Sequence, residues 1–364
     1  MRAAVLYSFN EPFKVEEVEL QDPRQGEVRV KLAASGVCHS DLSIQRGILP
    51  MPPPRIIGHE GAGVVEAVGP GVTSVATGDH VILCWMYPCG HCVECGKGMP
   101  AHCQTALGAM MSGGTYDGST RFRVRGQDMP HWVGSFAEST VVPETACVKI
   151  RKDAPLDKAC LVGCGVMTGV GAVLNTAKVE EGATVAVFGA GGVGLNVIQG
   201  ALLAGASRII AVDLLDSKLK LAREFGATDT VNGSKGDAEG EIRGLTGGKG
   251  VDYAFEVIGS PKVIAQAFAS LARGGKAVVV GAPPFGSEVT LPAFPFSMEE
   301  KSVIGSFYGS PRFHYDMPRI IDLYMAGRLK LDQLVTKTFP LADINKALEA
   351  MEQGTVARGV ILYR

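Results

Sequence analysis

The sequence predicts an α/β protein with two domains, one β-rich and one built on a doubly wound parallel sheet. Its 364 residues exceed what a single hydrophobic core usually organises. Residues 1 to about 150 hold short strand-like runs broken by glycine and proline, such as 27–32 and 63–68. From about 182 to 306 strands and helices alternate, which is typical of a parallel sheet covered by helices on both faces. We therefore expect one domain at 1–168, rejoined by a mixed, polar segment at 307–364, and a second domain at 169–306.

The elements of the second domain follow in order. The apolar, β-branched run 185–188 predicts a strand, and the uncharged run 195–204 predicts the next helix. Ser260 and Pro261 predict the start of a later helix, because serine caps a helix and proline suits its first turn. The other predicted elements are a strand at 208–212, a helix at 218–225 ended by Gly226, and strands at 251–257, 276–280 and 303–306.

Composition excludes several classes of function. The net charge is −2 and no basic tract is present, which argues against an extended nucleic-acid surface. The N-terminus lacks the apolar region of a secretory signal. The uncharged stretch 183–207 is interrupted by glycines, so it predicts a strand, a turn and a helix rather than a membrane span. The 9 cysteines, an odd number in a chain of this size, favour a reduced, cytoplasmic protein that binds metal.

A glycine-rich motif joins the first predicted strand of the second domain to its helix. Gly189-Ala190-Gly191-Gly192-Val193-Gly194 has the form G-x-G-x-x-G, in which backbone N–H groups and a helix N-terminus can bind a pyrophosphate. Asp213 ends the next strand, where a carboxylate can accept both ribose hydroxyls and repel a 2′-phosphate. The alternative is a packing turn without a ligand. The strand–helix context together with Asp213 favours a dinucleotide site, with NAD preferred over NADP.

Four cysteines with short spacings indicate a metal site. Cys89, Cys92, Cys95 and Cys103 could surround a tetrahedral Zn²⁺ with no open position, so this site would be structural. An iron–sulfur cluster also uses four cysteines, but the spacing is not that of a ferredoxin. We favour zinc. His91 and His102 lie in the same loop, and we expect them to stay outside a shell that four thiolates already fill.

Three further candidate ligands are scattered along the chain. Cys38, His59 and Cys164 each lie beside glycine or short polar residues. Two cysteines and one histidine would leave a fourth zinc position open, as catalytic sites need. An isolated cysteine is more often a small buried apolar residue. Spacing alone does not show that these three residues converge.

An ordered set of motifs resembles the zinc-containing alcohol dehydrogenases of the medium-chain dehydrogenase/reductase superfamily. The motifs are GVCHSD (36–41), GHEGAGVV (58–65), GDHV (78–81), the four-cysteine loop, GCGVMTG (163–169) and VFGAGGVG (187–194). The resemblance implies a GroES-like catalytic domain and a Rossmann domain with a six-stranded parallel sheet. It also implies an oxidoreductase with two Zn²⁺ ions per chain that transfers hydride reversibly between a primary alcohol, aliphatic or benzylic, and NAD.

The resemblance assigns roles at the catalytic metal. Cys38, His59 and Cys164 would bind the catalytic zinc. Asp41 would orient His59, and Glu60 would lie behind the metal as a transient ligand. Ser40 would accept the proton of the alcohol. Family members continue this relay to a histidine, but the matching position here is Ser43, so water or His39 would have to take its place.

The resemblance also assigns cofactor and substrate contacts. Beside the glycine motif and Asp213, the cofactor contacts would be His39 and Arg358 at the pyrophosphate, Lys218 at the ribose, Thr168 at the nicotinamide, and the backbone of Val280, Ser306 and Tyr308 at the carboxamide. The substrate pocket would be lined by Ser40, Leu49, Trp85, Trp132, Val133, Ala282 and Phe307. The long loop between Cys103 and Cys164 favours a homodimer, with a tetramer as the alternative.

Two alternative functions remain at this point. Glutathione-dependent formaldehyde dehydrogenases of the family recognise a thiol adduct with an acidic residue and an arginine. The matching positions are the apolar Leu49 and Leu107, which weakens that alternative but leaves another thiol open. A zinc-binding interaction module without catalysis is the second alternative, against which the neutral charge and the complete catalytic set argue. We expect a small-molecule alcohol or aldehyde as the partner, and neither nucleic acid nor membrane.

Overall fold

The computed structural model describes residues 1–363 and divides the chain into two compact units. The first unit comprises Met1–Cys164 and the segment that begins at Arg312, and the second is Gly165–Pro311. The predicted boundaries at 168 and 307 were therefore wrong by a few residues. A methyl group built on Gly309 would lie close to the carbonyl oxygen of Met167 and 3.0 Å from that of Thr168, so the segments 165–168 and 307–311 pack on each other within the second unit.

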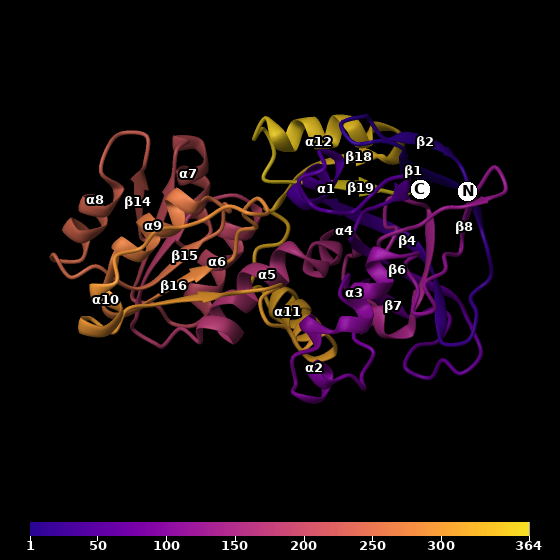
Figure 1. Ribbon diagram of the computed structural model, residues 1–364, viewed down its shortest axis with the longest axis horizontal. Helices are drawn as coiled ribbons and strands as arrows, with labels where there is room; N and C mark the ends of the chain where they lie inside the picture. The colour runs from indigo at the N-terminus through magenta and orange to yellow at the C-terminus, as the bar shows by residue number, and fades with distance from the viewer. Residues whose placement is uncertain (364) are drawn as a thin grey trace. The chain divides into compact units, whose positions relative to one another are not determined.

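The first unit is built around a seven-stranded sheet (Figure 1). The sheet order is β11 (Cys147–Ile150), β7 (His80–Leu83), β6 (Glu60–Val68), β4 (Glu27–Val37), β19 (Arg358–Leu362) and β18 (Val335–Pro340), with β10 (Ser139–Pro143) also paired with β4. β4 buries most of its side chains and pairs antiparallel with β6, β10 and β19. The C-terminal strand β19 thereby returns the chain to the first unit. Strand β4 lies in the middle of the seven-stranded sheet.

Two small sheets and six helices complete the first unit. The sheets are β2 (Lys14–Glu17), β1 (Arg2–Leu6), β5 (Arg55–Ile56), and β3 (Glu19–Leu20), β8 (Phe122–Val124), β9 (Gln127–Asp128). The helices are α1 (His39–Gln45), α2 (Val93–Gly96), α3 (Gln104–Met111), α4 (Leu156–Ala159), α11 (Phe313–Met325) and α12 (Ile344–Glu352). Short 3-10 turns occur at Pro100–His102, Glu144–Ala146, Cys160–Gly163 and Leu341–Asp343.

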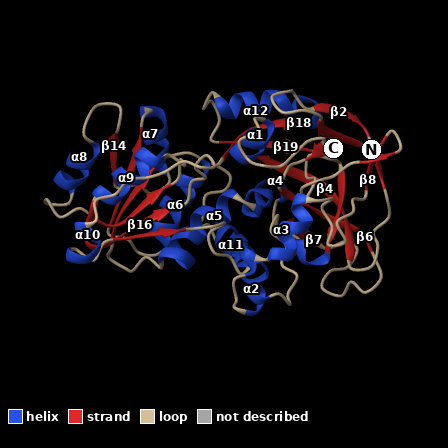
Figure 2. Ribbon diagram, viewed as in Figure 1, coloured by secondary structure: helices blue, strands red, loops and turns tan. Residues whose placement is uncertain are grey.

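The second unit is a six-stranded, wholly parallel sheet with helices around it (Figure 2). The order is β14 (Asp229–Asn232), β13 (Arg208–Asp213), β12 (Thr184–Phe188), β15 (Val251–Glu256), β16 (Leu271–Val279) and β17 (Ser302–Gly305). The helices are α5 (Gly165–Gly171), which continues as a π-helical segment at Ala172–Ala177, α6 (Gly192–Leu203), α7 (Asp216–Glu224), α8 (Ala238–Leu245), α9 (Pro261–Ala269) and α10 (Phe294–Met298). The strand order reverses between β12 and β15, which in such sheets is where a dinucleotide binds. The predicted doubly wound fold is confirmed.

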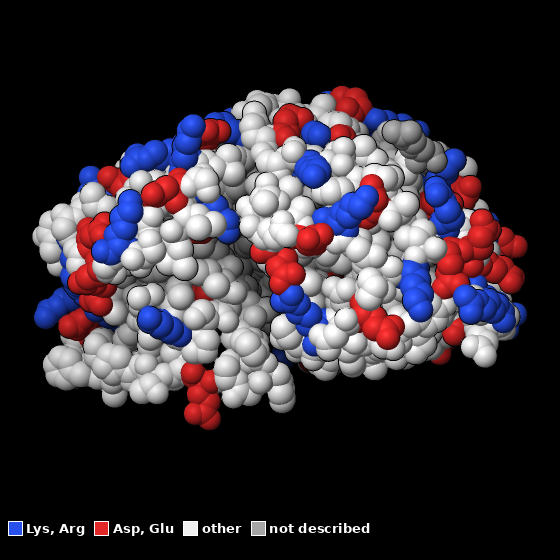
Figure 3. Space-filling view, turned by 90° about the horizontal axis from the view of Figure 1, so that it is seen from above, with Lys and Arg blue, Asp and Glu red and all other residues white. Residues whose placement is uncertain are grey.

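The surface carries charges of both signs. On the face drawn in Figure 3, lysine and arginine are mixed with aspartate and glutamate. Some of the protein's charged side chains form ion pairs, such as Arg2 with Glu138. No single helix among residues 1–363 is long and apolar enough to cross a membrane, although Leu156–Gly163 and Gly165–Ala177, a pair bent by 57°, reach that length and composition together.

Candidate metal centres and nucleotide site

The three scattered ligands converge in the first unit. The ligand atoms of Cys38, His59, Glu60 and Cys164 all lie within 4.8 Å of one another. Cys38 follows β4 and His59 precedes β6, and these strands pair so that Gly36 lies opposite Glu60. A methyl group built on Gly163 would lie 2.9 Å from the carbonyl oxygen of Leu83 in β7 and 3.5 Å from the Cα of Glu60 in β6, so the turn before Cys164 packs on both strands. Strand pairing thus brings together residues that are far apart in the sequence.

His59 is oriented as a metal ligand. Its Nδ1 lies 3.0 Å from Asp41 Oδ1 and donates to it, and both side chains are fully buried. The other carboxylate oxygen of Asp41 accepts the backbone N–H of Cys38 at 3.0 Å. His59 Nε2 is buried and has no hydrogen-bond partner in the described part of the chain. Because a buried nitrogen without a partner is costly, this atom fits a metal ligand held in place by Asp41.

The two thiols of this centre are coupled. The pKa of the Cys38 thiol is held well below its usual range, mainly by a hydrogen bond with Cys164. The nearby His59 lowers this pKa further, whereas burial opposes the shift. The same hydrogen bond raises the pKa of Cys164, and burial adds to that effect. Thiolate is the form that zinc requires.

Glu60 forms a buried ion pair with Arg358 that the sequence did not predict. Arg358 Nη2 donates to Glu60 Oε2 and also, at 3.3 Å, to the carbonyl oxygen of Val37. Burial raises the pKa of Glu60 to about 7, and the charge of Arg358 opposes that shift. A methyl group built on Gly36 would lie 1.9 Å from Glu60 Oε2, so only glycine leaves room for this carboxylate. The predicted contact of Arg358 with a pyrophosphate stays a prediction.

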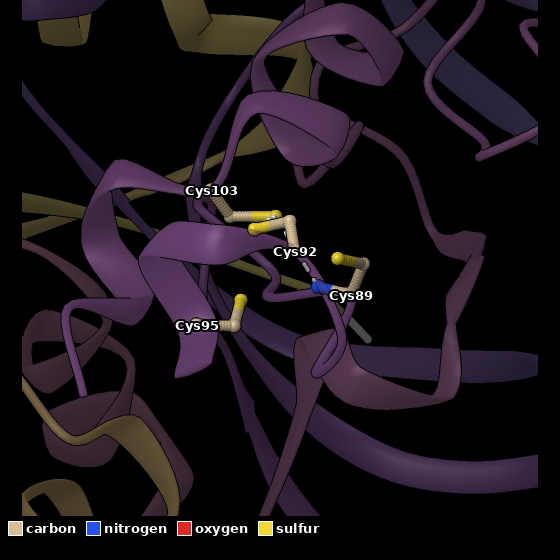
Figure 4. Close-up of side chains that lie close together, drawn as sticks. All are labelled: Cys89, Cys92, Cys95 and Cys103. Carbon is tan, nitrogen blue, oxygen red and sulfur yellow. Dashed lines mark hydrogen bonds between the residues drawn. The ribbon is translucent and has the colours of Figure 1, made fainter. Parts of the chain in front are cut away.

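The four-cysteine loop forms a second metal centre (Figure 4). The sulfurs of Cys89, Cys92, Cys95 and Cys103 all lie within 4.8 Å of one another, and all four thiols are free. Cys103 Sγ accepts the backbone N–H groups of Cys89 at 3.3 Å and Ala106 at 3.4 Å, which stabilise a thiolate. His91 and His102 are exposed and lie outside this set of ligands.

Both tryptophans of the chain lie against the first centre. The ring of Trp132 stacks on His59 at a centroid distance of 4.2 Å and an interplanar angle of 20°. Trp85 meets Trp132 edge-on at 5.5 Å and His59 at 6.3 Å. Val133 follows Trp132 with a φ of 53°, an unusual value for a β-branched residue, which fixes this turn in a strained form. A metal ligand is thus flanked by flat apolar surfaces.

Other predicted residues of the first unit lie on α1 and nearby. Ser40 Oγ is 3.8 Å from Cys38 Sγ, next to the metal ligands. His39 is exposed at the first position of α1, and Ser43 lies one turn later on the same helix. Leu49 is half-buried, whereas Leu107 on α3 is 40% exposed. The roles of these residues in proton transfer and substrate binding stay predictions.

The glycine motif of the second unit forms the expected turn. Gly189 has a φ of 104°, and a methyl group built on Gly194 would lie 1.8 Å from the carbonyl oxygen of Gly189, so both positions require glycine. A methyl group on Gly191 would meet no atom within 4 Å, so space remains beside the backbone there. Asp213 accepts the N–H of Ala190 at 2.8 Å, which ties the turn to the end of β13.

The remaining predicted cofactor and substrate residues lie in the second unit. Gly192 and Val193 begin α6, Lys218 lies in α7 and Thr168 in α5. Four more residues follow the strands β16 and β17: Val280, Ser306 and Tyr308, predicted to bind the carboxamide, and Phe307. Ala282 and Phe307 are exposed in this unit, so their predicted place beside the two tryptophans stays a prediction.

Two known protein families match parts of this chain. Residues 24–152 match the family described as "Alcohol dehydrogenase GroES-like domain", and residues 192–326 match "Zinc-binding dehydrogenase". The chain belongs to the zinc-dependent medium-chain dehydrogenase/reductase family. Its cofactors are NAD and two zinc ions, one at each cysteine-containing centre. The predicted family, GroES-like domain and cofactors are confirmed.

Individual relatives bear on the substrate. The alcohol dehydrogenase class-3 of Dictyostelium discoideum is 42% identical over 99% of this chain and 97% of its own length. The S-(hydroxymethyl)glutathione dehydrogenase of Paracoccus denitrificans is 43% identical over 100% of this chain and 99% of its own. The crystal structure of benzyl alcohol dehydrogenase from Acinetobacter calcoaceticus has a TM-score of 0.95 at 35% identity and covers 100% of this chain and 99% of that one. The second name is that of an enzyme for a hydroxymethyl thiol adduct, and it supports our alternative, the thiol-adduct formaldehyde dehydrogenase, better than the dehydrogenase of simple primary alcohols.

Proposed function

We propose that this dehydrogenase oxidises a primary hydroxymethyl group with NAD, and that its substrate is the hydroxymethyl adduct of a thiol and formaldehyde. One observation carries the reaction class. The ligand atoms of Cys38, His59 and Cys164 converge, and His59 Nε2 is buried there without a hydrogen-bond partner among the described residues. The choice of substrate follows the S-(hydroxymethyl)glutathione dehydrogenase of Paracoccus denitrificans, which is 43% identical over 100% of this chain.

The residues of the site have separate tasks in this reaction. Cys38, His59 and Cys164 hold the catalytic zinc, and Asp41 keeps the ring of His59 in place through Nδ1. When bound, zinc would supply a Lewis acid for the hydroxyl oxygen and NAD would supply the hydride acceptor. Ser40 Oγ accepts the proton of the substrate hydroxyl and passes it on. Trp132 and Trp85 exclude water beside His59 and select a flat or narrow substituent.

A benzylic primary alcohol is the second candidate substrate. The stacked Trp132 and the edge-on Trp85 provide aromatic faces next to His59, and an aromatic substrate would pack on such faces favourably. The benzyl alcohol dehydrogenase among the structural neighbours supports this candidate.

The apolar Leu49 and Leu107 also argue against recognition of glutathione by charge, so the thiol of the first candidate would be one other than glutathione.

A substrate panel distinguishes the two candidates. NADH formation is measured with formaldehyde plus glutathione, formaldehyde plus an uncharged or cationic thiol, benzyl alcohol, ethanol and propan-2-ol, and NADP replaces NAD in a parallel series. We expect the highest kcat/KM with a thiol adduct. A benzyl alcohol value tenfold above every adduct would select the second candidate. No NADH from any member would contradict the proposed reaction.

We also propose that the protein is a homodimer in the reducing cytoplasm. All nine cysteines are free thiols, which suits a reducing compartment. Strand β17 is an edge strand, and Phe285, Phe294 and Met298, which precede it in the sequence, are exposed by 97%, 68% and 60%. Apolar side chains beside an open edge are typical of a surface covered in the assembly. Sedimentation equilibrium at micromolar concentration should give twice the chain mass, and a monomer would contradict the proposal.

A further inference from the structure

Glu256 occupies an unusual position in the second unit. It is the last residue of β15 and pairs with Phe188 of β12, so it lies where the strand order of the sheet reverses. Its side chain is 1% exposed. A carboxylate buried this deeply is costly unless hydrogen bonds compensate it. The glycine motif begins directly after Phe188, so Glu256 lies next to the predicted dinucleotide site.

Glu256 binds five backbone N–H groups from two different loops. Its Oε1 accepts those of Ile258 at 2.9 Å, Gly259 at 2.7 Å and Ser260 at 3.2 Å. Its own backbone carbonyl accepts those of Val280 at 2.8 Å and Gly281 at 3.0 Å. One residue therefore fixes the loop that follows β15 and the loop that follows β16.

These two loops and the glycine turn are in close contact. A methyl group built on Gly281 would lie 2.1 Å from the backbone nitrogen of Gly259. A methyl group built on Gly189 would lie 2.8 Å from the Ile258 side chain. The loop 257–260 is thus packed between the glycine turn and the loop 280–282. With so little free space, a shift of its backbone must displace at least one neighbour.

We propose that Glu256 is a positioning residue for NAD. Its carboxylate holds loop 257–260 in the conformation that shapes the carboxyl edge of the sheet, where the dinucleotide binds. The inference rests on the proposed function, because it requires NAD at this edge. Charge-assisted bonds are roughly twice as strong as neutral ones, so a carboxylate holds this loop more firmly than an amide would. Its second oxygen, Oε2, is buried without a partner among residues 1–363.

The same strand provides a matched control. Asp252 lies at the opposite end of β15, where its carboxylate accepts the backbone N–H and the hydroxyl of Thr184, both at 2.7 Å. Asp252 therefore also joins β15 to β12 through hydrogen bonds to a carboxylate. It lies at the amino end of the strand, away from the loops that follow the carboxyl end. Asp252 is exposed whereas Glu256 is buried, so the Asp252 variants report what the loss of a carboxylate hydrogen bond in the same strand does away from the cofactor edge.

The test compares Glu256→Gln and Glu256→Met with Asp252→Asn and Asp252→Leu. The dissociation constant of NADH is measured by fluorescence titration of the intact protein, and thermal unfolding is followed in parallel. Glu256→Met removes the acceptor and should weaken NADH binding at least tenfold. Glu256→Gln keeps one oxygen and should weaken it by a smaller factor, about threefold. Both Asp252 variants should bind NADH as the wild type does, even where their unfolding temperature falls.

Three outcomes are distinguished. Equal NADH affinity in a folded Glu256→Met variant, or equal losses at Glu256 and Asp252, would overturn the inference. If Glu256→Met does not fold, Glu256→Gln decides: faster hydrogen exchange at 258–260 with weaker NADH binding supports the inference, and unchanged values overturn it. A wild-type protein that binds no NADH would instead refute the proposed function.

Discussion

Gly36→Ala should destabilise the first unit and disturb the catalytic centre, although it adds only one methyl group. That methyl would lie 1.9 Å from Glu60 Oε2 and 2.9 Å from Leu161 Cδ2. Neither neighbour can move freely, because Glu60 is fully buried and paired with Arg358, and Leu161 is fully buried as well. Overpacking alone costs about 1–3 kcal/mol. If Glu60 is pushed away from Arg358, the broken buried pair adds about 3–5 kcal/mol. We therefore expect a loss of about 3 kcal/mol or more in the free energy of unfolding.

A glycine of the neighbouring strand serves as the control. Gly359 of β19 pairs with Val37 in the same sheet, and a methyl group there would lie 3.4 Å from the ring of Phe339, an ordinary contact. Urea unfolding of the zinc-loaded proteins measures both variants against the wild type. Gly359→Ala should change stability by less than about 1 kcal/mol, as changes without a clash usually do. A Gly36→Ala protein as stable as the wild type, or no less stable than Gly359→Ala, would refute the steric reasoning.

Three further predictions concern the cofactor, the pocket and stability. Asp213→Gly should weaken NAD binding by about 1.5–3 kcal/mol, because hydrogen bonds to a charged acceptor are lost, and it should allow NADP to bind. Both effects are measured as kcat/KM with each cofactor, and a wild-type protein that prefers NADP would contradict the prediction. Trp85→Ala should raise kcat/KM for a secondary alcohol relative to a primary one, because it widens the space beside His59; an equal fall for both alcohols would show that Trp85 is only scaffold. Burial, reinforced by the charge of Arg55, lowers the pKa of the fully buried His131 to about 3. The unfolded chain therefore binds a proton below about pH 6.5 that the folded chain does not, so this stability is complete above that pH and is lost as the pH falls towards 3. At pH 5 the loss should be about 2 kcal/mol in chemical unfolding, and His131→Gln should remove this component; an unchanged pH profile would show that His131 does not titrate in this way.

The sequence predicted the second unit well because its signals are local. Buried parallel strands are continuous apolar runs, and the glycine motif adopts a turn in which a methyl group on Gly194 would meet the carbonyl oxygen of Gly189 five residues earlier. The four-cysteine centre was found for the same reason, since its ligands share one loop. The boundary at 168 was misplaced because it depends on how Gly309 packs against Met167 and Thr168, which no local pattern reports.

The catalytic centre was predicted only through the family resemblance. Its ligands come together because β4 pairs with β6, and strand pairing between distant segments leaves no mark in residue spacing. The Glu60–Arg358 pair joins residues 298 positions apart and was missed for that reason. Glu256 was missed because a glutamate at the end of an apolar strand gives no sign that its carboxylate binds the next loop. The residue pattern likewise did not identify the substrate. The names of the relatives shifted the preferred substrate from a simple primary alcohol to a thiol adduct.

The central claim is that one cysteine-containing centre is catalytic and the other structural. It is tested most directly by measuring zinc content and NADH production in the wild type, Cys164→Ser and Cys95→Ser. The wild type should contain two zinc ions per chain, in line with its two ligand sets. Cys164→Ser should stay folded and bind NADH but lose turnover, whereas Cys95→Ser should lose stability, because binding of structural zinc is coupled to folding. A Cys164→Ser protein that oxidises alcohol at the wild-type rate would contradict the account.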